Sequence, residues 1–490
     1  MSIEALVKLV HGADLKTWTE LNKDAYKGLF EGDHRRYQKA AQNAFDLRAP
    51  AMSEDTGVAY AAYIHPANPK SGPYGGTSFV TFPVSGAPCL FGLVVGTQGL
   101  APDATILGRP GHARKTRAIC DWLNKKYGNG EQIAWAKHDP TRTDIPIPET
   151  LAKSWDHYNS VFARYGNVLY AAFRPTTDEN ATEAALKAFL DLLLEERGHQ
   201  ALAASMADST EIKNEWFGYL MPSLERGTVA QLLSDRHFVV IQGPPGTGKT
   251  RMARELLRCE YGGNGRSVQF HPNTTYEAFV GGLAPTRGKS QLGLSFEPLP
   301  GFLMEAAVEA TKDPTRPYLL HIDEINRADL SKVLGEAIFL FEARPEEPRK
   351  IDLQYDFETL NGRTLSLPPN LHVLGTMNSA DRSIVIVDIA VRRRFAFVSL
   401  WPQMSVVQSN GCQRMQEAFQ RLLAIFVEHA SDDAFNLLPG HSYFLEDNEA
   451  KAPQSLKVNL APLLEEYLSQ GYVGGFAEPI RSYLQWLRSL

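Results

Sequence analysis

The eight residues from Gly243 to Thr250 have the types and spacing of a phosphate-binding loop. They fit the pattern G-x-x-x-x-G-K-[ST] at every fixed position. Glycines let such a loop wrap and direct its N–H groups at phosphate oxygens. Lys249 is expected to reach the β- and γ-phosphates, and Thr250 to ligate Mg²⁺. The predicted nucleotide site is Gly243, Pro244, Pro245, Gly246, Thr247, Gly248, Lys249 and Thr250.

Two adjacent carboxylates, Asp323 and Glu324, close an apolar run that starts at Tyr318. A buried strand seldom ends in two acids unless a cation lies nearby. Asp323 is the predicted second Mg²⁺ ligand, acting through water. Glu324 is predicted to orient the attacking water or accept its proton. A solvated turn is the alternative, and the phosphate loop upstream disfavours it.

A parallel sheet is expected to position these groups, because short apolar strands alternate with longer helices from about residue 229. We therefore predict an α/β fold with a P-loop core, a C-terminal helical lid and a separate mixed α/β domain before it. Strands are expected at 237–242, 318–323, 371–377 and 395–400, and helices at 249–261 and 329–343. The predicted domains are 1–198 for target recognition, 199–228 as a connector, 229–402 as the NTPase core and 403–490 as the lid.

The N-terminal region, residues 1–198, is the least informative part of the sequence. Residues 1–200 carry 22 basic and 22 acidic side chains, so this half is not an evident nucleic-acid binder. Residues 104–138 are locally basic and contain Trp122, Tyr127 and Trp135, which could stack a base. The alternative, a solvated helix with Trp122 in the core, is somewhat favoured.

Composition narrows the classes of protein. The chain has 490 residues, 43% hydrophobic and 22% charged, with a net charge of -6, which is an ordinary globular balance. Four cysteines form no C-x-x-C pair, which fits a reducing cytoplasm and argues against a cysteine zinc site. We find neither a signal peptide nor a membrane span and expect a cytoplasmic protein without a membrane partner.

Further motifs give the core a specific resemblance. Residues 322–336 resemble the acidic-strand region of McrB-type AAA+ motors, the NTPase subunits of modification-dependent restriction systems. The run 375–383 is similar to that family's M-N-T-A-D-R signature, with Ser379 in place of threonine, and 391–395 resembles its R-R-R-F end. Residues 270–280, 440–444 and 462–467 also resemble family segments, so the resemblance covers about 225–470.

The resemblance implies a homo-oligomeric ring, a hexamer by the family pattern, with nucleotide bound between subunits. It implies that Asn378 is a sensor that polarises water and the γ-phosphate, and that Arg394 is an arginine finger. Arg392 and Arg393 share that role or contact the ring interface. Asp381 and Arg382 are expected to orient the sensor loop. Segments 270–300 and 342–367 resemble inserts that form hairpins facing the pore or a partner, with ordinary surface hairpins as an equal alternative.

Two further questions are which nucleotide the chain uses and whether it contains a nuclease site. The N-K-x-D base-reading motif is absent, so we favour ATP narrowly, as the AAA+ default, over the GTP of McrB-type enzymes. Glu211-Ile-Lys213 has an E-x-K shape with Asp208 before it, but the spacing is too tight for a nuclease core. We expect cutting to come from a separate subunit.

Three functions are compatible with these motifs. The first is a nucleotide-hydrolysing ring motor that recognises foreign or modified DNA and drives a separate nuclease in defence. The second is a MoxR-like remodelling chaperone that acts on protein complexes. The third is a nucleotide-switched sensor whose N-terminal domain binds a ligand. The M-N-S-A-D-R and R-R-R-F residues favour the first.

Overall fold

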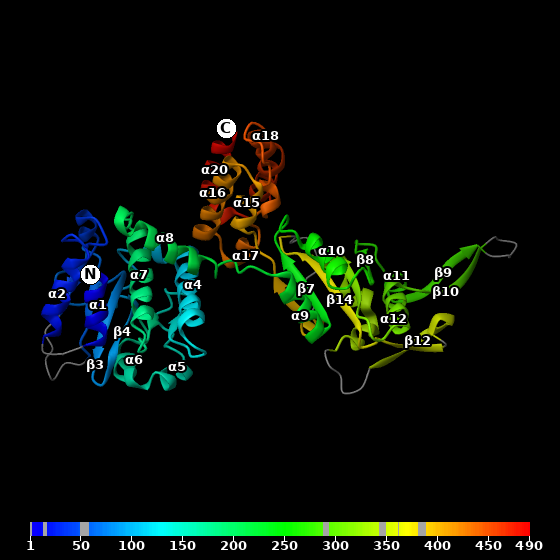
Figure 1. Cartoon of the computed structure of the whole chain (residues 1–490), viewed down its shortest axis with the longest axis horizontal. Coiled ribbons are helices and arrows are strands. Elements are labelled where there is room, and N and C mark those ends of the chain that lie inside the picture. Colours follow the sequence, from blue (N-terminus) through cyan, green and yellow to red (C-terminus); the bar gives the residue numbers. More distant parts are fainter. Residues whose placement is uncertain are drawn as a thin grey trace. The chain divides into compact units, whose positions relative to one another are not determined.

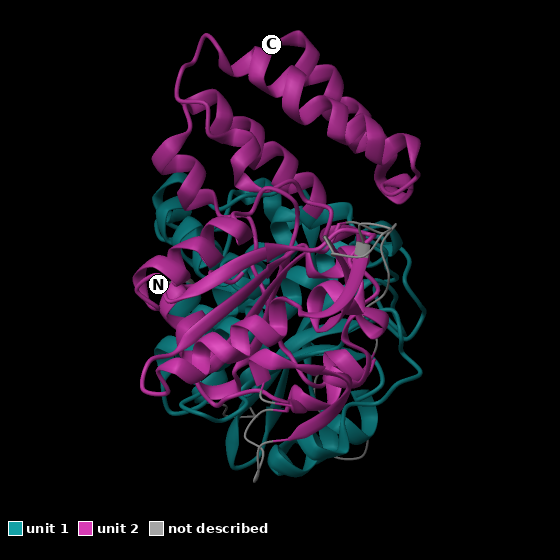
Figure 2. Cartoon of the chain, turned by 90° about the vertical axis from the view of Figure 1, so that its right-hand side faces the viewer, with its two compact units in different colours: residues 1–221, 427–430 teal, residues 222–426, 431–490 magenta. Residues whose placement is uncertain are grey.

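The computed structural model describes residues 2–12, 17–49, 58–287, 294–342, 349–360, 362–380 and 389–490. The chain divides into two compact units (Figure 2). Unit 1 comprises residues 1–221 and 427–430, and unit 2 comprises 222–426 and 431–490. Within the described ranges, no helix has the length and apolar character that a bilayer crossing requires.

Unit 1 is built on a six-stranded antiparallel sheet in the order β1-β2-β3-β4-β6-β5. The strands are β1 Asp46–Arg48, β2 Ala61–Ile64, β3 Thr77–Val84, β4 Ala87–Val95, β5 Ala134–Ala136 and β6 Leu169–Phe173. The helices are α1 Ser2–His11, α2 Trp18–Gly28, α3 Ala104–Leu107, α4 Pro110–Tyr127, α5 Glu149–Ser154, α6 Asn159–Tyr165, α7 Glu179–Glu195 and α8 Ala203–Phe217.

Successive side chains of a strand point to opposite faces, so this sheet has two cores. Val80 and Phe82 of β3 pack in a core that also holds Tyr158 and Phe162, which lie around α6. On the other face, Phe79 of β3 lies 5.8 Å, between ring centroids, from a phenylalanine of β4. Helices α1 and α7 contact β4 and β3 (Figure 1). Unit 1 is thus a mixed, antiparallel-sheet domain.

Unit 2 contains a five-stranded parallel sheet in the order β15-β7-β14-β11-β8. Its strands are β7 Phe238–Gly243, β8 Gly265–Gln269, β11 Tyr318–Asp323, β14 Leu371–Asn378 and β15 Ala396–Ser399. The helices of this core are α9 Arg226–Arg236, α10 Lys249–Cys259, α11 Tyr276–Phe279, α12 Phe302–Lys312, α13 Leu330–Leu334 and α14 Ile389–Arg392.

Both faces of the parallel sheet are covered, as its apolar strands require. Val239 and Ile241 of β7 pack with Leu256 of α10 in one core. Val240 of the same strand packs with Leu303 of α12 in another. The predicted fold class, an α/β P-loop core with a separate mixed domain before it and helices after it, is confirmed.

Two antiparallel hairpins extend the core (Figure 1). One pairs β9 Gly281–Arg287 with β10 Leu294–Pro300, and the other pairs β12 Lys350–Phe357 with β13 Gly362–Ser366. They lie in the two segments that resemble inserts. Hairpins are thus present in both segments, and their contact with the pore or a partner stays a prediction.

The C-terminal part is helical. Its helices are α15 Met404–Asn410, α16 Gln413–His429, α17 Asp432–Phe435, α18 Ala452–Ser455, α19 Ala461–Ser469 and α20 Ala477–Ser489. A short 3₁₀ turn, His441–Phe444, falls in the predicted interruption. Four residues near the end of α16, 427–430, group with unit 1.

Three local predictions differ from the structure. The helix expected over 329–343 breaks after α13, where Gly335 has a positive φ of 49°, and continues as 3₁₀ turns. Strand β8 was not predicted, because as an edge strand it buries only Val268. The segment predicted as a connector contains the fifteen-residue helix α8, which contacts α4 and α7.

Candidate nucleotide site

The phosphate loop lies between β7 and α10 in the conformation that its glycines permit. Gly246 and Gly248 have φ values of 79° and 86°, in the left-handed region that favours glycine. Nζ of Lys249 donates to the carbonyl oxygens of Gly243 at 2.9 Å and Pro244 at 2.7 Å. Burial lowers the pKa of Lys249 to about 8, although the negative charges of Glu324 and Asp323 act in the opposite direction.

Asp323 ends β11 and meets the start of α10. Its Oδ1 accepts a hydrogen bond from Oγ1 of Thr250 at 3.0 Å and a second from Oγ1 of Thr376, a buried residue of β14. The predicted Mg²⁺ ligands Thr250 and Asp323 are thus in contact. Thr376, which carries no motif that would single it out in the sequence, fixes the carboxylate.

Glu324 follows with an unusual backbone. Its φ of 52° is left-handed, which is uncommon for a residue with a side chain and is found often at functional sites. Oε2 is buried and accepts no hydrogen bond from the described residues, although Nε of Arg327 lies 3.4 Å away. This carboxylate oxygen is therefore in an ion pair with Arg327 but accepts no hydrogen bond from the described residues.

Asn378 lies beside the phosphate loop because β14 and β7 are parallel neighbours. It is in register with Gly243, and the N–H of Ser379 donates to the Gly243 carbonyl at 3.0 Å. Oδ1 of Asn378 accepts the Ala380 N–H at 3.1 Å. Asn326 donates to the Asn378 carbonyl at 3.3 Å. The parallel sheet thus brings Asn378, Lys249, Thr250 and both carboxylates together at the carboxyl ends of its central strands.

The three arginines of the R-R-R-F run lie differently. Nη1 of Arg394 donates to the carbonyl of Ala390 at 2.8 Å, and its Nε is buried without a partner among the described residues. Arg392 lies over the Phe397 ring at 5.1 Å. Arg393 is exposed. Asp381 and Arg382 lie outside the described residues.

The basic segment of unit 1 is largely engaged in contacts. Arg114 donates to the carbonyls of Val427 and Ala430, at 2.8 and 2.6 Å. Lys115 pairs with Glu196 at 2.7 Å. Trp122 is 2% exposed and cannot stack on a base. The favoured alternative, a helix with Trp122 in the core, is therefore correct for that residue.

A different part of unit 1 offers accessible aromatic rings. A cavity of about 250 Å³ opens beside β3 and β4. Tyr60 and Tyr165 meet edge to face across 6.1 Å, and the guanidinium of Arg48 lies 5.3 Å from the Tyr74 ring centre. The lining residues are Tyr60, Tyr74, Val80, Phe82, Val94, Val95, Thr97, Arg164, Tyr165 and Val168. We call this cavity the aromatic hollow.

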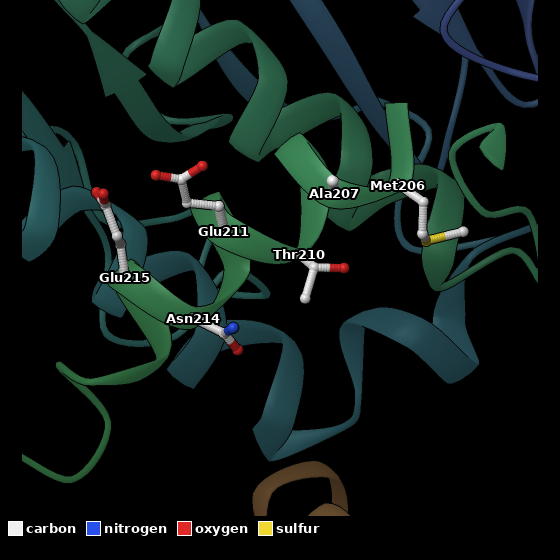
Figure 3. Close-up of a pocket in the computed structure, with 6 residues that line it drawn as sticks. All are labelled: Met206, Ala207, Thr210, Glu211, Asn214 and Glu215. Atoms are coloured by element: carbon white, nitrogen blue, oxygen red, sulfur yellow. The ribbon is translucent and has the colours of Figure 1, made fainter. Parts of the chain in front are cut away.

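Helix α8 carries the E-x-K residues and an open hollow of about 700 Å³ (Figure 3). Figure 3 shows that all its lining residues, Met206, Ala207, Thr210, Glu211, Asn214 and Glu215, come from this one helix. Asp208 is paired with Arg36 and Lys187, and Lys213 with Glu195. Across the described part of the chain, no three His, Cys, Asp or Glu side chains gather as a metal site.

Comparison with known proteins identifies a domain family within unit 2 and two similar proteins. Residues 238–395 match the AAA domain (dynein-related subfamily). The chain is 29% identical over 356 residues to the Type IV methyl-directed restriction enzyme EcoKMcrB subunit of Escherichia coli K12, covering 66% of this chain and 75% of that protein. It is 26% identical over 189 residues to the Type II restriction enzyme BsuMI component YdiS of Bacillus subtilis 168, covering 32% and 55%.

A crystal structure from Cytophaga hutchinsonii matches 49% of this chain and 88% of that one, with 12% identity and a TM-score of 0.24, too low to bear on the fold. The matched family model spans the phosphate loop, the acidic strand and the arginine run. The similarity to the Escherichia coli protein covers 356 residues and therefore extends beyond that model. Residues 238–395 therefore form an AAA domain of the dynein-related subfamily, a nucleoside-triphosphatase domain, and the chain is similar to the McrB subunit over 66% of its length.

Proposed function

We propose that the chain is the ring-forming motor of a restriction system, which recognises foreign or modified DNA through residues 1–198 and drives a separate nuclease. The observation that carries the proposal is the meeting of Thr250, Asp323 and Glu324 at the phosphate loop of a McrB-like core. Both relatives named above are restriction enzymes, and their names call them a subunit and a component.

Hydrolysis follows from the positions of the chain's own groups. Lys249 exchanges the Gly243 and Pro244 carbonyls for phosphate oxygens, because a polyanion is a stronger acceptor than a carbonyl. The Glu324 oxygen that accepts no hydrogen bond from the described residues takes the proton of the attacking water or orients it. Asn378 holds the water and the γ-phosphate from the neighbouring strand end.

The residues present fit Mg²⁺ as the cofactor. The Thr250 hydroxyl and the Asp323 carboxylate are hard oxygen donors in contact with each other. With no three-residue metal cluster among the described residues, the ion would share its coordination with phosphates, as Mg²⁺ commonly does. Bound there, Mg²⁺ neutralises charge on the β- and γ-phosphates.

The ring is proposed from the arginine run. An arginine finger, an arginine that one subunit inserts into its neighbour's site, raises the rate of hydrolysis about 10³-fold or more because it stabilises charge on the transferred phosphoryl group. The sequence pattern favours Arg394, whereas exposure favours Arg393, because Arg394 is held by the Ala390 carbonyl. A hexamer is the expected state.

DNA recognition is proposed for unit 1, through the aromatic hollow. Rings such as Tyr60 and Tyr165 stack bases irrespective of sequence, and Arg48 and Arg164 place positive charge near these rings for a phosphate backbone. The basic segment 104–138 is a weaker candidate, because Arg114 and Lys115 are engaged within unit 1.

The test is an affinity purification of the Glu324→Gln protein from its native cells, with bound proteins and nucleic acids identified. A nuclease subunit recovered with DNA is the expected result. Recovery of client proteins without DNA would instead establish a remodelling chaperone. Hydrolysis of ATP and GTP by the wild-type protein, measured side by side, decides the nucleotide, with ATP expected.

A further inference from the structure

A short segment of the C-terminal lid, residues 440–442, is bonded to the phosphate loop through its backbone. The Gly440 N–H donates to the Pro245 carbonyl at 2.8 Å, and the Ser442 N–H donates to the Gly246 carbonyl at 3.0 Å. A Cβ on Gly440 would lie 2.1 Å from the Gly246 carbonyl carbon, so the approach requires glycine there. The residue between these two donors, His441, is therefore held against the loop.

The two ring nitrogens of His441 face different neighbours, Nδ1 the backbone of Gln403 and Nε2 the phosphate loop at Gly248. Nδ1 accepts the Gln403 N–H, at a long 3.4 Å. Nε2 lies 3.7 Å from the point that a Cβ on Gly248 would occupy. In a neutral imidazole one nitrogen accepts and the other carries the proton. Acceptance at Nδ1 places that proton on Nε2, and burial, with Arg251 nearby, lowers the pKa of His441 and favours the neutral ring.

Gly248 is where the loop turns into α10, and the N–H groups of this turn cradle phosphates in such loops. Beside Gly246 the lid also places Oγ of Ser442 and the ring of Tyr443, whereas the atom within 4 Å of a Cβ on Gly248 is Nε2 of His441. All four arginines of residues 403–490 pair with glutamates: Arg414 with Glu449, Arg421 with Glu417, Arg481 with Glu478 and Arg488 with Glu465.

We propose that His441 is a nucleotide-contacting residue, whose Nε2–H donates a hydrogen bond to a phosphate oxygen of the nucleotide on the Gly243–Thr250 loop. This inference rests on the proposed nucleotide site and adds a lid residue to it. Nucleotide contact at His441 and the backbone bonds at Pro245 and Gly246 would together make the lid respond to the phosphates present.

The test compares full-length His441→Phe and His441→Gln proteins by titration with fluorescent nucleoside di- and triphosphates. Phenylalanine keeps a ring but removes the donor, whereas glutamine restores a donor. A hydrogen bond to a charged group contributes about 1.5–3 kcal/mol. We therefore expect Phe to weaken binding about 10-fold or more and Gln to recover most of it. Lys451→Gln, at an exposed lid residue outside the segment that contacts the loop, is the control and should bind like wild type.

Equal loss in the Phe and Gln variants, or no loss in either, would overturn the proposal, because packing alone would then explain the ring. A second measurement needs no variant: a structure of the wild-type protein with bound nucleoside diphosphate should place Nε2 within hydrogen-bond distance of a phosphate oxygen. Wild-type protein that binds no nucleotide would refute the nucleotide site itself, whereas tight wild-type binding with an indifferent His441 would refute only this inference.

Discussion

Glu324 joins two features at the residue scale, a left-handed backbone and a buried carboxylate oxygen without a hydrogen-bond donor among the described residues. Glu324→Gln keeps the shape but removes the base, and general-base catalysis contributes about 10²–10⁴-fold. We expect nucleotide binding to persist while hydrolysis falls by that factor, as measured by phosphate release and by nucleotide titration. Glu309→Gln, an exposed residue of α12, is the control. Normal turnover by Glu324→Gln would contradict the assignment.

The hydrogen bond from Thr376 allows a test of the two predicted Mg²⁺ ligands, Thr250 and Asp323. The Thr376 hydroxyl bonds the carboxylate that Thr250 also contacts. Thr376→Val removes that bond at constant volume, so the carboxylate becomes less well oriented. We expect a several-fold higher Mg²⁺ concentration for half-maximal hydrolysis, and recovery in Thr376→Ser. An unchanged Mg²⁺ requirement in the valine variant would show that this bond is dispensable.

The lowered pKa of Lys249 implies that nucleotide binding depends on pH. Its pKa is lowered from 10.5 to about 8 in the folded chain, because burial disfavours its charge. The buried neutral amine therefore makes its full contribution to the free energy of unfolding above the unfolded pKa of 10.5. This contribution is lost as pH falls through about 8, because the amine then becomes charged in the folded chain. A bound polyanion favours the protonated amine, so binding near pH 8 should take up a proton, and affinity should fall as pH rises further.

Calorimetry of nucleotide binding near pH 8, in buffers of different ionisation enthalpy, measures that uptake. Lys249→Arg is the matched variant, because arginine stays protonated. We expect proton uptake in the wild type and none in the variant, provided the variant still binds. Equal uptake in both would assign the proton to another group.

At the scale of elements, the lid is held to the phosphate loop through Gly440. Its φ of -67° is ordinary, so alanine brings no backbone strain there and acts only through the 2.1 Å contact with the Gly246 carbonyl carbon. We expect Gly440→Ala to separate the lid from the loop and weaken nucleotide binding several-fold. Limited proteolysis should then cut near 439–444 faster than in the wild type. Gly471→Ala, in an open turn of the lid, should leave binding unchanged despite its positive φ of 72°.

The elements that carry the site were largely predictable, for a physical reason. The carboxyl ends of parallel strands lie on the same side of the sheet, so the loop after β7, Asp323 at the end of β11 and Asn378 at the end of β14 must converge. Thr376 was not predictable, because a threonine inside a strand indicates only a β-former. The contact of Gly440 with the loop was equally hidden, since the partners lie almost 200 residues apart, a contact of the kind that only the tertiary structure reveals. For the basic segment the sequence favoured a helix with Trp122 in the core, and Trp122 is buried while ion pairs engage Lys115 and Lys126.

At the scale of the whole molecule, the two units have different chemistry. Unit 1 offers the aromatic hollow, and unit 2 the nucleotide site. Replacing Tyr60 and Tyr165 by alanine removes two stacking surfaces, each worth about 1–3 kcal/mol per base. We expect DNA binding to fall at least 10-fold while basal hydrolysis, measured without DNA, is unchanged. Lys125→Ala, an exposed charge of the basic segment, is the comparison. A larger loss there would move the DNA surface to residues 104–138.

The ring itself is tested by mixing two inactive proteins. An arginine finger acts on a neighbouring subunit, so Arg393→Ala lacks the finger but keeps its own site, whereas Glu324→Gln lacks the base but keeps its finger. Each should bind nucleotide and hydrolyse it slowly. Random mixing should restore activity at roughly a quarter of the interfaces in a closed ring. The same mixing with Arg394→Ala identifies the finger, because only the finger variant is rescued. If neither is rescued, hydrolysis takes place within one subunit and the ring has no part in it.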